Sequence, residues 1–348
     1  MSIHRRSAFL FAGIILALGC SSTSDAPSAA AGAGGTAGAP SSAGGSANIA
    51  GGGASAAGAS ASGGAAAGAS GANASAGAGS HITGTSSGCG KPNADTPKDW
   101  TMHSINVTVD AAFAADYSTR TYFTRPPKNY DPSHAYPVTV WGNGCGQSAA
   151  EPTQISSGPG ADGSIMVEML ANPKNHNCYS AGPDGDNASS PEVPYFDAVL
   201  AEAEAEFCID RGKVFMGGWS SGGWFTTLLA CTRSNVIKGV GWASAGLQLN
   251  HPACMGPMPA ILERGVDDNG TPLAQTDAAR EDLRLRNGCS TETEAWDPGE
   301  TAFTTTTCVS YKGCMPGFPL VWCPIPGGHN NGGTLSSIGF WKFWTALP

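Results

Sequence analysis

A short apolar strand, a glycine-rich turn and a helix follow one another directly in the middle of the chain. The run Lys213–Met216 has the character of a buried strand, and residues 224–231 have that of a helix. In the turn between them, Gly218 and Gly222 stand two residues before and after Ser220. A serine on so sharp a turn adopts a strained backbone, which requires neighbours with minimal side chains. The segment therefore predicts an α/β fold with an exposed serine between a strand and a helix.

Strands and helices also alternate through the rest of the chain after residue 88. The clearest helix is Phe196–Phe207, where apolar residues recur three, four, seven and eleven positions after Phe196. Other strand-like runs are Ile105–Val109, Thr119–Thr124, Val138–Trp141, Ser164–Met169, Val240–Trp242, Ala260–Glu263 and Leu320–Cys323. This alternation predicts one α/β domain over residues 88–348, with a mostly parallel sheet covered by helices on both faces.

Residues 1–20 are typical of an export signal. A basic start precedes the apolar run Ala8–Leu18, which is too short to span a bilayer and ends in Gly-Cys at Cys20. Small residues before a cysteine resemble a bacterial lipobox, in which the cysteine carries the lipid. Ala17 stands where that motif usually has leucine, so an ordinary cleaved signal peptide is the alternative. We expect a secreted or cell-surface lipoprotein whose lipid is its only contact with the membrane.

Residues 21–87 consist almost entirely of serine, alanine, glycine and threonine. Such a composition is typical of a flexible linker without a core of its own. The whole chain of 348 residues has a formal net charge of −9 and no basic stretch. That balance argues against a nucleic-acid partner.

The chain has 11 cysteines, an odd number. Setting Cys20 aside as the lipid carrier leaves ten, which can form five disulfides in an oxidising compartment. These ten are Cys89, Cys145, Cys178, Cys208, Cys231, Cys254, Cys289, Cys308, Cys314 and Cys323. No two cysteines have the C-x-x-C spacing, so a zinc or redox site is not indicated. Cys314 with Cys323 and Cys208 with Cys231 are plausible pairs.

Ser220 needs two partners to act as a nucleophile, because a serine hydroxyl is unreactive without a base that a carboxylate orients. After such a turn the chain order is serine, acid, histidine. Of the seven histidines, only His251 and His329 follow Ser220. His329 lies in a glycine-rich loop after the strand Leu320–Cys323, whereas His251 precedes any suitable acid. His329 is therefore the predicted base.

The acid is expected at the end of a strand between Ser220 and His329. The run Ala260–Glu263 is followed by Arg-Gly-Val-Asp-Asp, so Asp267 and Asp268 are both candidates. We predict Asp268, with Asp267 as the alternative.

Two backbone N–H groups are expected to stabilise a developing oxyanion. One is that of Ser221, at the start of the helix after the turn. The other should come from a glycine-rich turn after an early strand. The strand-like run Val138–Trp141 is followed by such a turn, with the sequence Gly-Asn-Gly-Cys-Gly. We predict the N–H of Cys145; a tight turn without a catalytic role is the alternative.

The segment from Cys208 to Gly223, with Ala230-Cys231, resembles the extracellular polyhydroxybutyrate depolymerase and feruloyl esterase group of α/β-hydrolases. Shorter stretches support it: Gly88-Cys-Gly90, Gly144-Cys-Gly146, Val193-Pro-Tyr-Phe-Asp197, Asn287-Gly-Cys289, Val321-Trp-Cys323 and Gly327-Gly-His329. The resemblance implies a serine carboxylic-ester hydrolase with an acyl-enzyme intermediate and no cofactor or metal. The family's usual acid motif, His-Gly-x-x-Asp, corresponds here to a stretch that ends at Asp268, which supports that choice.

One departure concerns the oxyanion turn, where the family usually has a histidine and this chain has Asn143. The change leaves open a catalytically weak surface lipoprotein that only binds glycan or polyester. The resemblance leaves three ester substrates: a hydroxycinnamoyl ester on plant cell-wall polysaccharide, a poly(3-hydroxybutyrate)-type polyester and an acetylated polysaccharide. Trp219, Trp224 and Trp322 are candidates for an aromatic acyl pocket, with core packing as the alternative.

Overall fold

The computed structural model describes residues 81–92, 99–146, 159–182, 189–299, 307–330 and 335–348. All of them belong to one unit of the chain, Gly71–Pro348. The predicted signal segment with Cys20 and nearly all of the predicted linker lie outside these ranges. Within the described ranges, no helix combines the length and apolar character needed to cross a bilayer.

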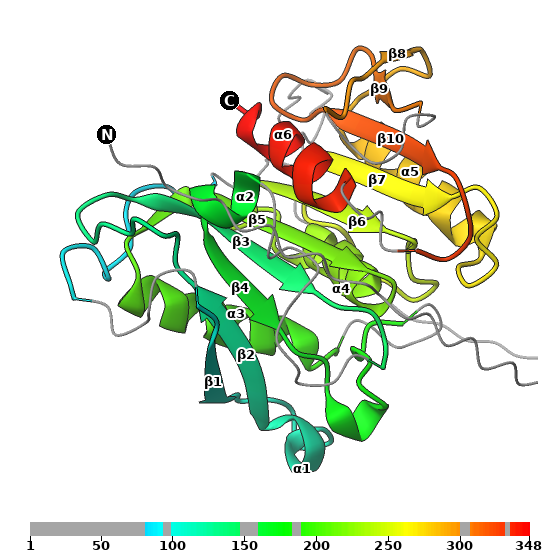
Figure 1. The fold of residues 1–348 in the computed structure, drawn as a ribbon. Helices are drawn as coiled ribbons and strands as arrows, with labels where there is room; N and C mark the ends of the chain where they lie inside the picture. Colours follow the sequence, from blue (N-terminus) through cyan, green and yellow to red (C-terminus); the bar gives the residue numbers. More distant parts are fainter. Residues whose placement is uncertain (1–80, 93–98, 147–158, 183–188, 300–306, 331–334) are drawn as a thin grey trace, which may run out of the picture. The chain divides into compact units, whose positions relative to one another are not determined.

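The strands of the described residues form a single ten-stranded sheet in the order β1-β2-β4-β3-β5-β6-β7-β10-β9-β8 (Figure 1). The strands are β1 Thr101–Asn106, β2 Thr119–Arg125, β3 Tyr136–Gly142, β4 Ile165–Met169, β5 Ile209–Trp219, β6 Gly239–Ala243, β7 Ala260–Gly265, β8 Thr293–Ala295, β9 Val309–Tyr311 and β10 Leu320–Ile325. The pairs from β4 through β3, β5, β6 and β7 to β10 are parallel, and those at both edges are antiparallel. The predicted mostly parallel sheet is confirmed.

Helices cover the sheet on both faces, as the alternating pattern predicts (Figure 1). The helical segments are α1 Ala114–Tyr117, α2 Pro159–Gly163, η1 Pro173–Asn175, α3 Glu192–Glu206, α4 Ser221–Thr232, α5 Leu273–Arg286, η2 Leu335–Gly339 and α6 Phe340–Thr345. One apolar core lies between the sheet and α3, α4 and α5; a second lies under α2 and α6. Because helices cover both faces, β4, β6 and β7 are buried along their whole length rather than at alternate residues. This is the α/β-hydrolase fold expected from the sequence.

Several elements begin earlier than their apolar patterns predict, and β1, β5 and α3 do so by four residues each. β1 starts at Thr101 and ends before Val107, because an edge strand with a half-exposed, alternating pattern needs no continuous apolar run. α3 starts at Glu192 rather than Phe196. Pro194 falls in its first turn, where a missing N–H breaks no helical hydrogen bond.

The folded part also begins upstream of residue 88. The N–H of Ile82 donates to Asn235 O, and the N–H of Ser86 donates to Ile209 O. Ser86 is buried, and its Oγ donates to Phe207 O at 2.5 Å. Residues 82–87 resemble the linker in composition, yet hydrogen bonds to the start of β5 make them part of the domain.

The ten cysteines form five disulfides: Cys89–Cys208, Cys145–Cys178, Cys231–Cys254, Cys289–Cys314 and Cys308–Cys323. Both pairs suggested from the sequence are wrong, although the number is right. Separation along the chain is a poor guide, because the sheet topology decides which side chains meet. Five disulfides point to an oxidising compartment outside the cytoplasm.

Candidate active site

The turn between β5 and α4 holds Ser220 in a backbone conformation that few residues adopt. Its φ and ψ angles are 52° and −119°, a strained state for a residue with a side chain. A Cβ atom on Gly218 would lie 2.3 Å from Gly222 O, and one on Gly222 would lie 1.9 Å from Gly142 O. Both positions therefore require glycine, as the sequence pattern predicts.

The structure brings the side chains of Ser220, His329 and Asp268 together. His329 Nε2 lies 2.8 Å from Ser220 Oγ, and His329 Nδ1 lies 3.0 Å from Asp268 Oδ1. The three residues follow β5, β10 and β7 respectively. Because these strands run parallel, their carboxyl ends meet at one edge of the sheet, where ligands of open α/β sheets bind. The distances suit proton transfer from the serine to the histidine.

Asp268 occupies a tight turn that supplies N–H donors to its carboxylate. It is 3% exposed, and its Oδ1 accepts hydrogen bonds from the N–H groups of Gly270 at 2.8 Å and Thr271 at 3.0 Å. Burial alone raises the pKa of Asp268, but these two donors and the His329 ring outweigh it, so the pKa lies below its usual value. Asp268 is consequently an ionised partner for His329.

Asp267 is exposed and makes its backbone contact elsewhere, through an N–H that donates to Gly327 O at 2.9 Å. Of the two acids that the sequence left open, Asp268 is the one beside His329. In this turn, the side chain of an acid accepts hydrogen bonds from the backbone N–H groups two and three residues later, which here belong to a glycine and a threonine. Such a turn is recognisable in a sequence. The sequence pattern did not single out Gly270 and Thr271, whose N–H groups donate to the carboxylate.

His329 is held from several sides. A Cβ atom on Gly270 would lie 2.8 Å from His329 Cγ, so the turn after Asp268 packs directly on the ring. The indole of Trp219 contacts the ring from another side, at a tilt of 41° and with 5.7 Å between centroids. Ser244 Oγ donates to Asn330 O at 2.9 Å and fixes the loop just beyond the histidine.

The turn after β3 packs against the first turn of α4, where the sequence predicts two oxyanion donors. The close approach of Gly142 O to Gly222 brings the backbones together. Ser221 is buried at the helix start, whereas Cys145 is exposed and joined to Cys178. Asn143 is buried and accepts a hydrogen bond from the indole of Trp141 at 3.1 Å. The Asn143 side chain thus packs within its own turn.

The three tryptophans considered for an acyl pocket have different positions. Trp219 is half-buried and in ring contact with His329. Trp224 is 5% exposed in the core under α3 and α4. Trp322 packs against the same core, and Arg280 lies over its ring at 4.9 Å. For Trp224 and Trp322, the core-packing alternative describes what the structure has.

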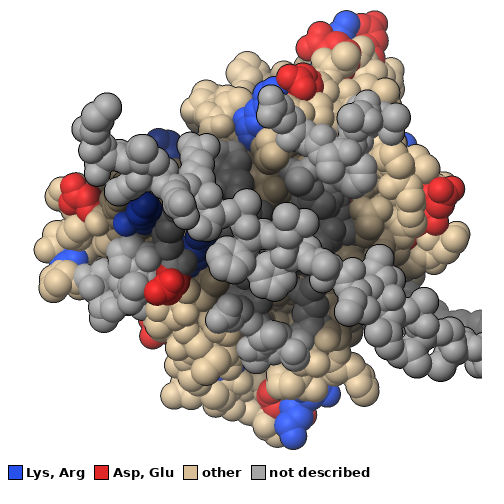
Figure 2. All heavy atoms as spheres, viewed as in Figure 1, with Lys and Arg blue, Asp and Glu red and all other residues tan. Residues whose placement is uncertain are grey.

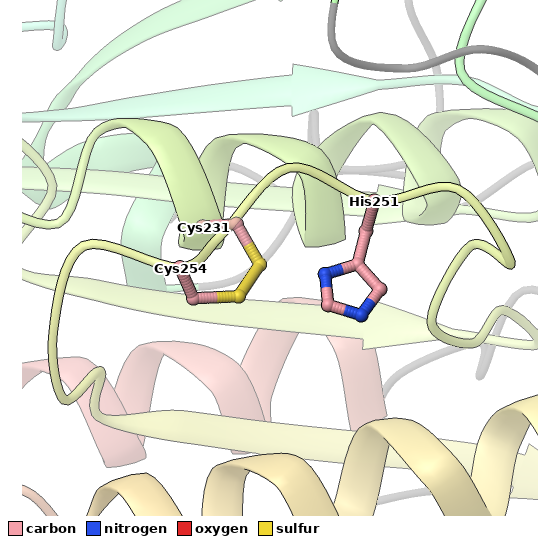
Figure 3. A group of neighbouring side chains, drawn as sticks. All are labelled: Cys231, His251 and Cys254. Carbon is pink, nitrogen blue, oxygen red and sulfur yellow. A yellow bond between two sulfur atoms is a disulfide. The ribbon is translucent and has the colours of Figure 1, made fainter. Parts of the chain in front are cut away.

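One histidine and two cysteines lie close enough to suggest a metal site, at the far end of α4 from Ser220 (Figure 3). Cys231 and Cys254 are joined in a disulfide, and a sulfur in a disulfide is not a thiolate ligand. His251 Nδ1 lies 2.9 Å from Pro252 O. The cluster is therefore a structural crosslink beside a histidine.

Charged side chains are sparse on the face shown in Figure 2, where the described lysines, arginines and acids occur singly or in small mixed groups. Among the described residues, exposed charged side chains also form ion pairs, such as Lys342 Nζ with Asp297 Oδ2 at 2.9 Å. Such pairs contribute little to stability.

No family model matches the chain. The probable feruloyl esterase C of Aspergillus clavatus is 26% identical over 239 residues, which are 65% of this chain and 84% of that protein. Feruloyl esterase D of Neurospora crassa is 29% identical over 222 residues, 61% of this chain and 74% of that protein. These relatives confirm the feruloyl esterase side of the resemblance; the polyhydroxybutyrate depolymerase side stays a prediction.

Solved structures with a similar fold include a ferulic acid esterase from Anaeromyces mucronatus, determined with ferulic acid. It has 14% identity and a TM-score of 0.44, over 72% of this chain and 90% of that one. An acetyl xylan esterase from Aspergillus awamori has 14% identity and a TM-score of 0.48, over 66% of this chain and 94% of that one.

Proposed function

We propose that this α/β-hydrolase, a carboxylic ester hydrolase related to the feruloyl esterases, cleaves hydroxycinnamoyl esters of plant cell-wall polysaccharide through an acyl-enzyme on Ser220. The observation that carries the proposal is the chain of short contacts from Asp268 through His329 to Ser220 Oγ, at 3.0 and 2.8 Å. The strained backbone of Ser220 adds support, because it projects the hydroxyl from the end of a buried strand.

In the first half of the reaction, Ser220 Oγ attacks the ester carbonyl carbon while His329 Nε2 takes the hydroxyl proton. The carbonyl oxygen becomes an oxyanion, which the N–H groups of Ser221 and Cys145 receive. The carboxylate of Asp268 stabilises the imidazolium and holds the ring orientation. When the intermediate collapses, His329 gives its proton to the departing alcohol oxygen, and the acyl group remains on Ser220.

In the second half, a water molecule gives a proton to His329 and attacks the acyl carbon. The same N–H groups receive the second oxyanion. The protonated His329 then returns its proton to Ser220 Oγ as the ester bond breaks, and the free acid leaves. Because the lowered pKa of Asp268 keeps its carboxylate ionised at neutral pH, the same support is present in both halves.

The names of the two relatives support a hydroxycinnamic acid as the acyl group. The half-buried indole of Trp219 beside His329 adds an aromatic surface at the site. The test is hydrolysis of methyl ferulate, a poly(3-hydroxybutyrate) film and acetylated xylan by the full chain and its Ser220→Ala variant. Serine-dependent release of ferulate alone supports the proposal. If only the film is cleared, or only acetate is released, the substrate is the polyester or the acetylated polysaccharide instead. If a folded wild type hydrolyses none of the three, the result favours a binding lipoprotein.

We also propose that the protein is exported and anchored through a lipid on Cys20. The five disulfides support export, since such bonds persist outside the cytoplasm. Detergent partitioning of the protein and of a Cys20→Ser variant tests the anchor. The wild type should enter the detergent phase and the variant should not; a wild type that stays in the aqueous phase contradicts the anchor.

A further inference from the structure

A segment between β4 and α3 contacts both sides of the proposed oxyanion hole. We call residues 172–181 the strap. It follows β4, forms the short turn η1, passes the start of α4, and ends before the chain enters α3. No sequence motif marks the strap, and the proposed mechanism does not use it.

The first contact of the strap is with the turn after β3. Cys178 is joined by a disulfide to Cys145, the residue whose N–H we assign to the oxyanion. The N–H of Gly146 donates to Asn177 O at 3.2 Å. Two successive residues of this turn, Cys145 and Gly146, are therefore fixed to the strap, the first by a covalent bond and the second by a hydrogen bond.

The second contact is with the nucleophile turn. The N–H of Tyr179 donates to Ser221 Oγ at 2.8 Å, and Ser221 supplies the other proposed donor. The ring of Tyr179 stacks on Phe225 of α4, with centroids 4.8 Å apart and planes 18° apart, and its hydroxyl donates to Met169 O. A Cβ atom on Gly142 would lie 3.4 Å from Tyr179 Cζ. Tyr179 is 2% exposed, so these contacts are shielded from water.

The strap is itself anchored and strained. His176 and Asn177 have φ angles of 53° and 54°, in the left-handed region that residues with a side chain seldom adopt. Asn172 is buried, and its amide donates to Asp116 O at 2.9 Å. At the other end, the N–H of Ser180 donates to Glu192 Oε1 at 2.9 Å.

Glu192 is a rigid anchor for that end. Its Oε2 accepts a hydrogen bond from Arg120 at 2.9 Å, and the two side chains are 0% and 2% exposed. A buried pair of this kind is disrupted only at a large cost. The strap thus runs between fixed points, and the strain at its middle is held by the surrounding structure.

We infer that Cys178 and Tyr179 are positioning residues, which set the distance between the two oxyanion donors by holding Cys145 from one side and Ser221 from the other. The inference rests on the proposed function. Donors of an oxyanion hole act because they are fixed before the reaction, and a displacement of about 1 Å at such a site lowers the rate about 100-fold. Neither residue touches the substrate in this role.

The test compares two double variants of the full chain, Cys145→Ala/Cys178→Ala and Cys289→Ala/Cys314→Ala. The two disulfides enclose 33 and 25 residues, so their loss relaxes the unfolded chain to a similar extent. We expect kcat for methyl ferulate to fall about 10- to 100-fold in the first variant. In the second it should stay within about 2-fold, as a substitution remote from the chemistry leaves transition-state contacts in place.

The affinity for a trifluoromethyl ketone, which forms a tetrahedral adduct with the serine, distinguishes positioning from a general loss of structure. It should fall in parallel with kcat in the first variant, while KM changes less than about 3-fold, because the oxyanion contact exists only in the adduct and the transition state. Equal kcat in both double variants, or a loss confined to KM, overturns the inference.

A single variant keeps the test decisive if the first double variant does not fold. Ser221→Ala removes the acceptor of the Tyr179 N–H and retains the backbone N–H of residue 221. We expect a fall in kcat of about 3- to 10-fold, again with a parallel loss of inhibitor affinity; wild-type kcat in a folded Ser221→Ala overturns the role of Tyr179. The proposed function itself fails on a different result, an inactive wild type or an active Ser220→Ala.

Discussion

Asp268, in the turn after β7, and Glu168, in the middle of β4, are 3% and 0% exposed, yet their carboxyl groups have different surroundings. Asp268 accepts two backbone N–H groups and contacts His329. Both carboxyl oxygens of Glu168 lack a hydrogen-bond partner within the described part of the chain. Accordingly, the pKa of Asp268 is lowered, whereas burial raises the pKa of Glu168 to about 8.

The comparison teaches that free N–H donors, rather than the degree of burial, set the charge of a buried acid in this fold. Within the sheet the backbone N–H groups of β4 are used in pairing with β2 and β3. A turn beyond the end of a strand has N–H groups to spare. Glu263 of β7 follows the same rule: burial raises its pKa well above the usual value, although Ser336 Oγ donates to it at 3.2 Å. A carboxylate that must stay ionised is therefore found in a turn at the edge of the sheet.

The largest effect is expected from the ionised member of the comparison. Asp268→Asn keeps the shape of the side chain but removes its charge and its preference for the reactive tautomer of His329. We expect kcat for methyl ferulate to fall about 10⁴-fold, the loss typical of removing a triad carboxylate. The exposed Asp267→Asn is the matched control and should stay within about 2-fold. A loss of similar size in both variants would show that the two acids act together.

The neutral member should make stability depend on pH between its ordinary and its raised pKa. With its folded pKa near 8 and an ordinary value of 4.5, Glu168 favours the folded state fully below pH 4.5 and loses this contribution as the pH rises to about 8. The free energy of unfolding should fall by up to about 1.4 kcal/mol per pH unit in that window.

Urea unfolding of the wild type and Glu168→Gln between pH 5 and 8 measures this contribution. The decline should be shallower in Glu168→Gln, where Glu263 alone still contributes to it, and Glu294→Gln, at an exposed position of β8, should keep the full decline of the wild type. Parallel curves for the wild type and Glu168→Gln would mean that Glu168 is ionised in the fold.

A smaller effect is expected from the turn that surrounds Asp268. In Gly270→Ala, the new methyl group meets the His329 ring at 2.8 Å, so the ring or the turn must shift. We expect kcat to fall about 10- to 30-fold, in the range that misplacement of a catalytic group produces. Gly256→Ala, whose methyl group would have only Ser234 Oγ nearby at 3.7 Å, should be neutral. A Gly270→Ala variant with wild-type kcat would show that the turn adapts without moving His329.

The smallest effect concerns stability in acid. Because the folded pKa of Asp268 is lowered, its contribution is present above the ordinary value of 3.8 and is lost as the pH falls through the folded pKa. Thermal unfolding between pH 5 and 2 should therefore decline less steeply for Asp268→Asn than for the wild type. If the two decline alike, the turn donors do not stabilise the carboxylate.

The parts of the site that the sequence predicted are those fixed locally or by chain order. Ser220 follows from a strand, a glycine turn and a helix in direct succession. His329 follows from being one of two histidines after Ser220, in a loop that directly follows a strand. Both depend on neighbours within a few residues, so the pattern and the structure agree.

The remaining features depend on contacts across the fold. Neither disulfide pair suggested from the sequence forms. Cys208 pairs with Cys89, 119 residues away along the chain, and Cys314 pairs with Cys289. The strap reaches the site only through the packing of the loop after β4. Trp224 and Trp322 were candidates for an acyl pocket only because they are tryptophans. In the structure, Trp224 lies in the core and Trp322 packs against it. The preference for Asp268 over Asp267 came from the resemblance to the family's acid motif, and the structure adds the reason, which is that the turn directs the Asp268 side chain toward His329.

Rapid acid quenching with peptide mapping shows whether Ser220 carries the acyl group during turnover. The full chain is mixed with methyl ferulate, quenched during turnover and digested, and the peptides are examined by mass spectrometry. We expect a feruloyl ester on the peptide that contains Ser220, and none in Ser220→Ala. Turnover of methyl ferulate with the acyl group on another residue, or undiminished turnover by Ser220→Ala, would contradict it.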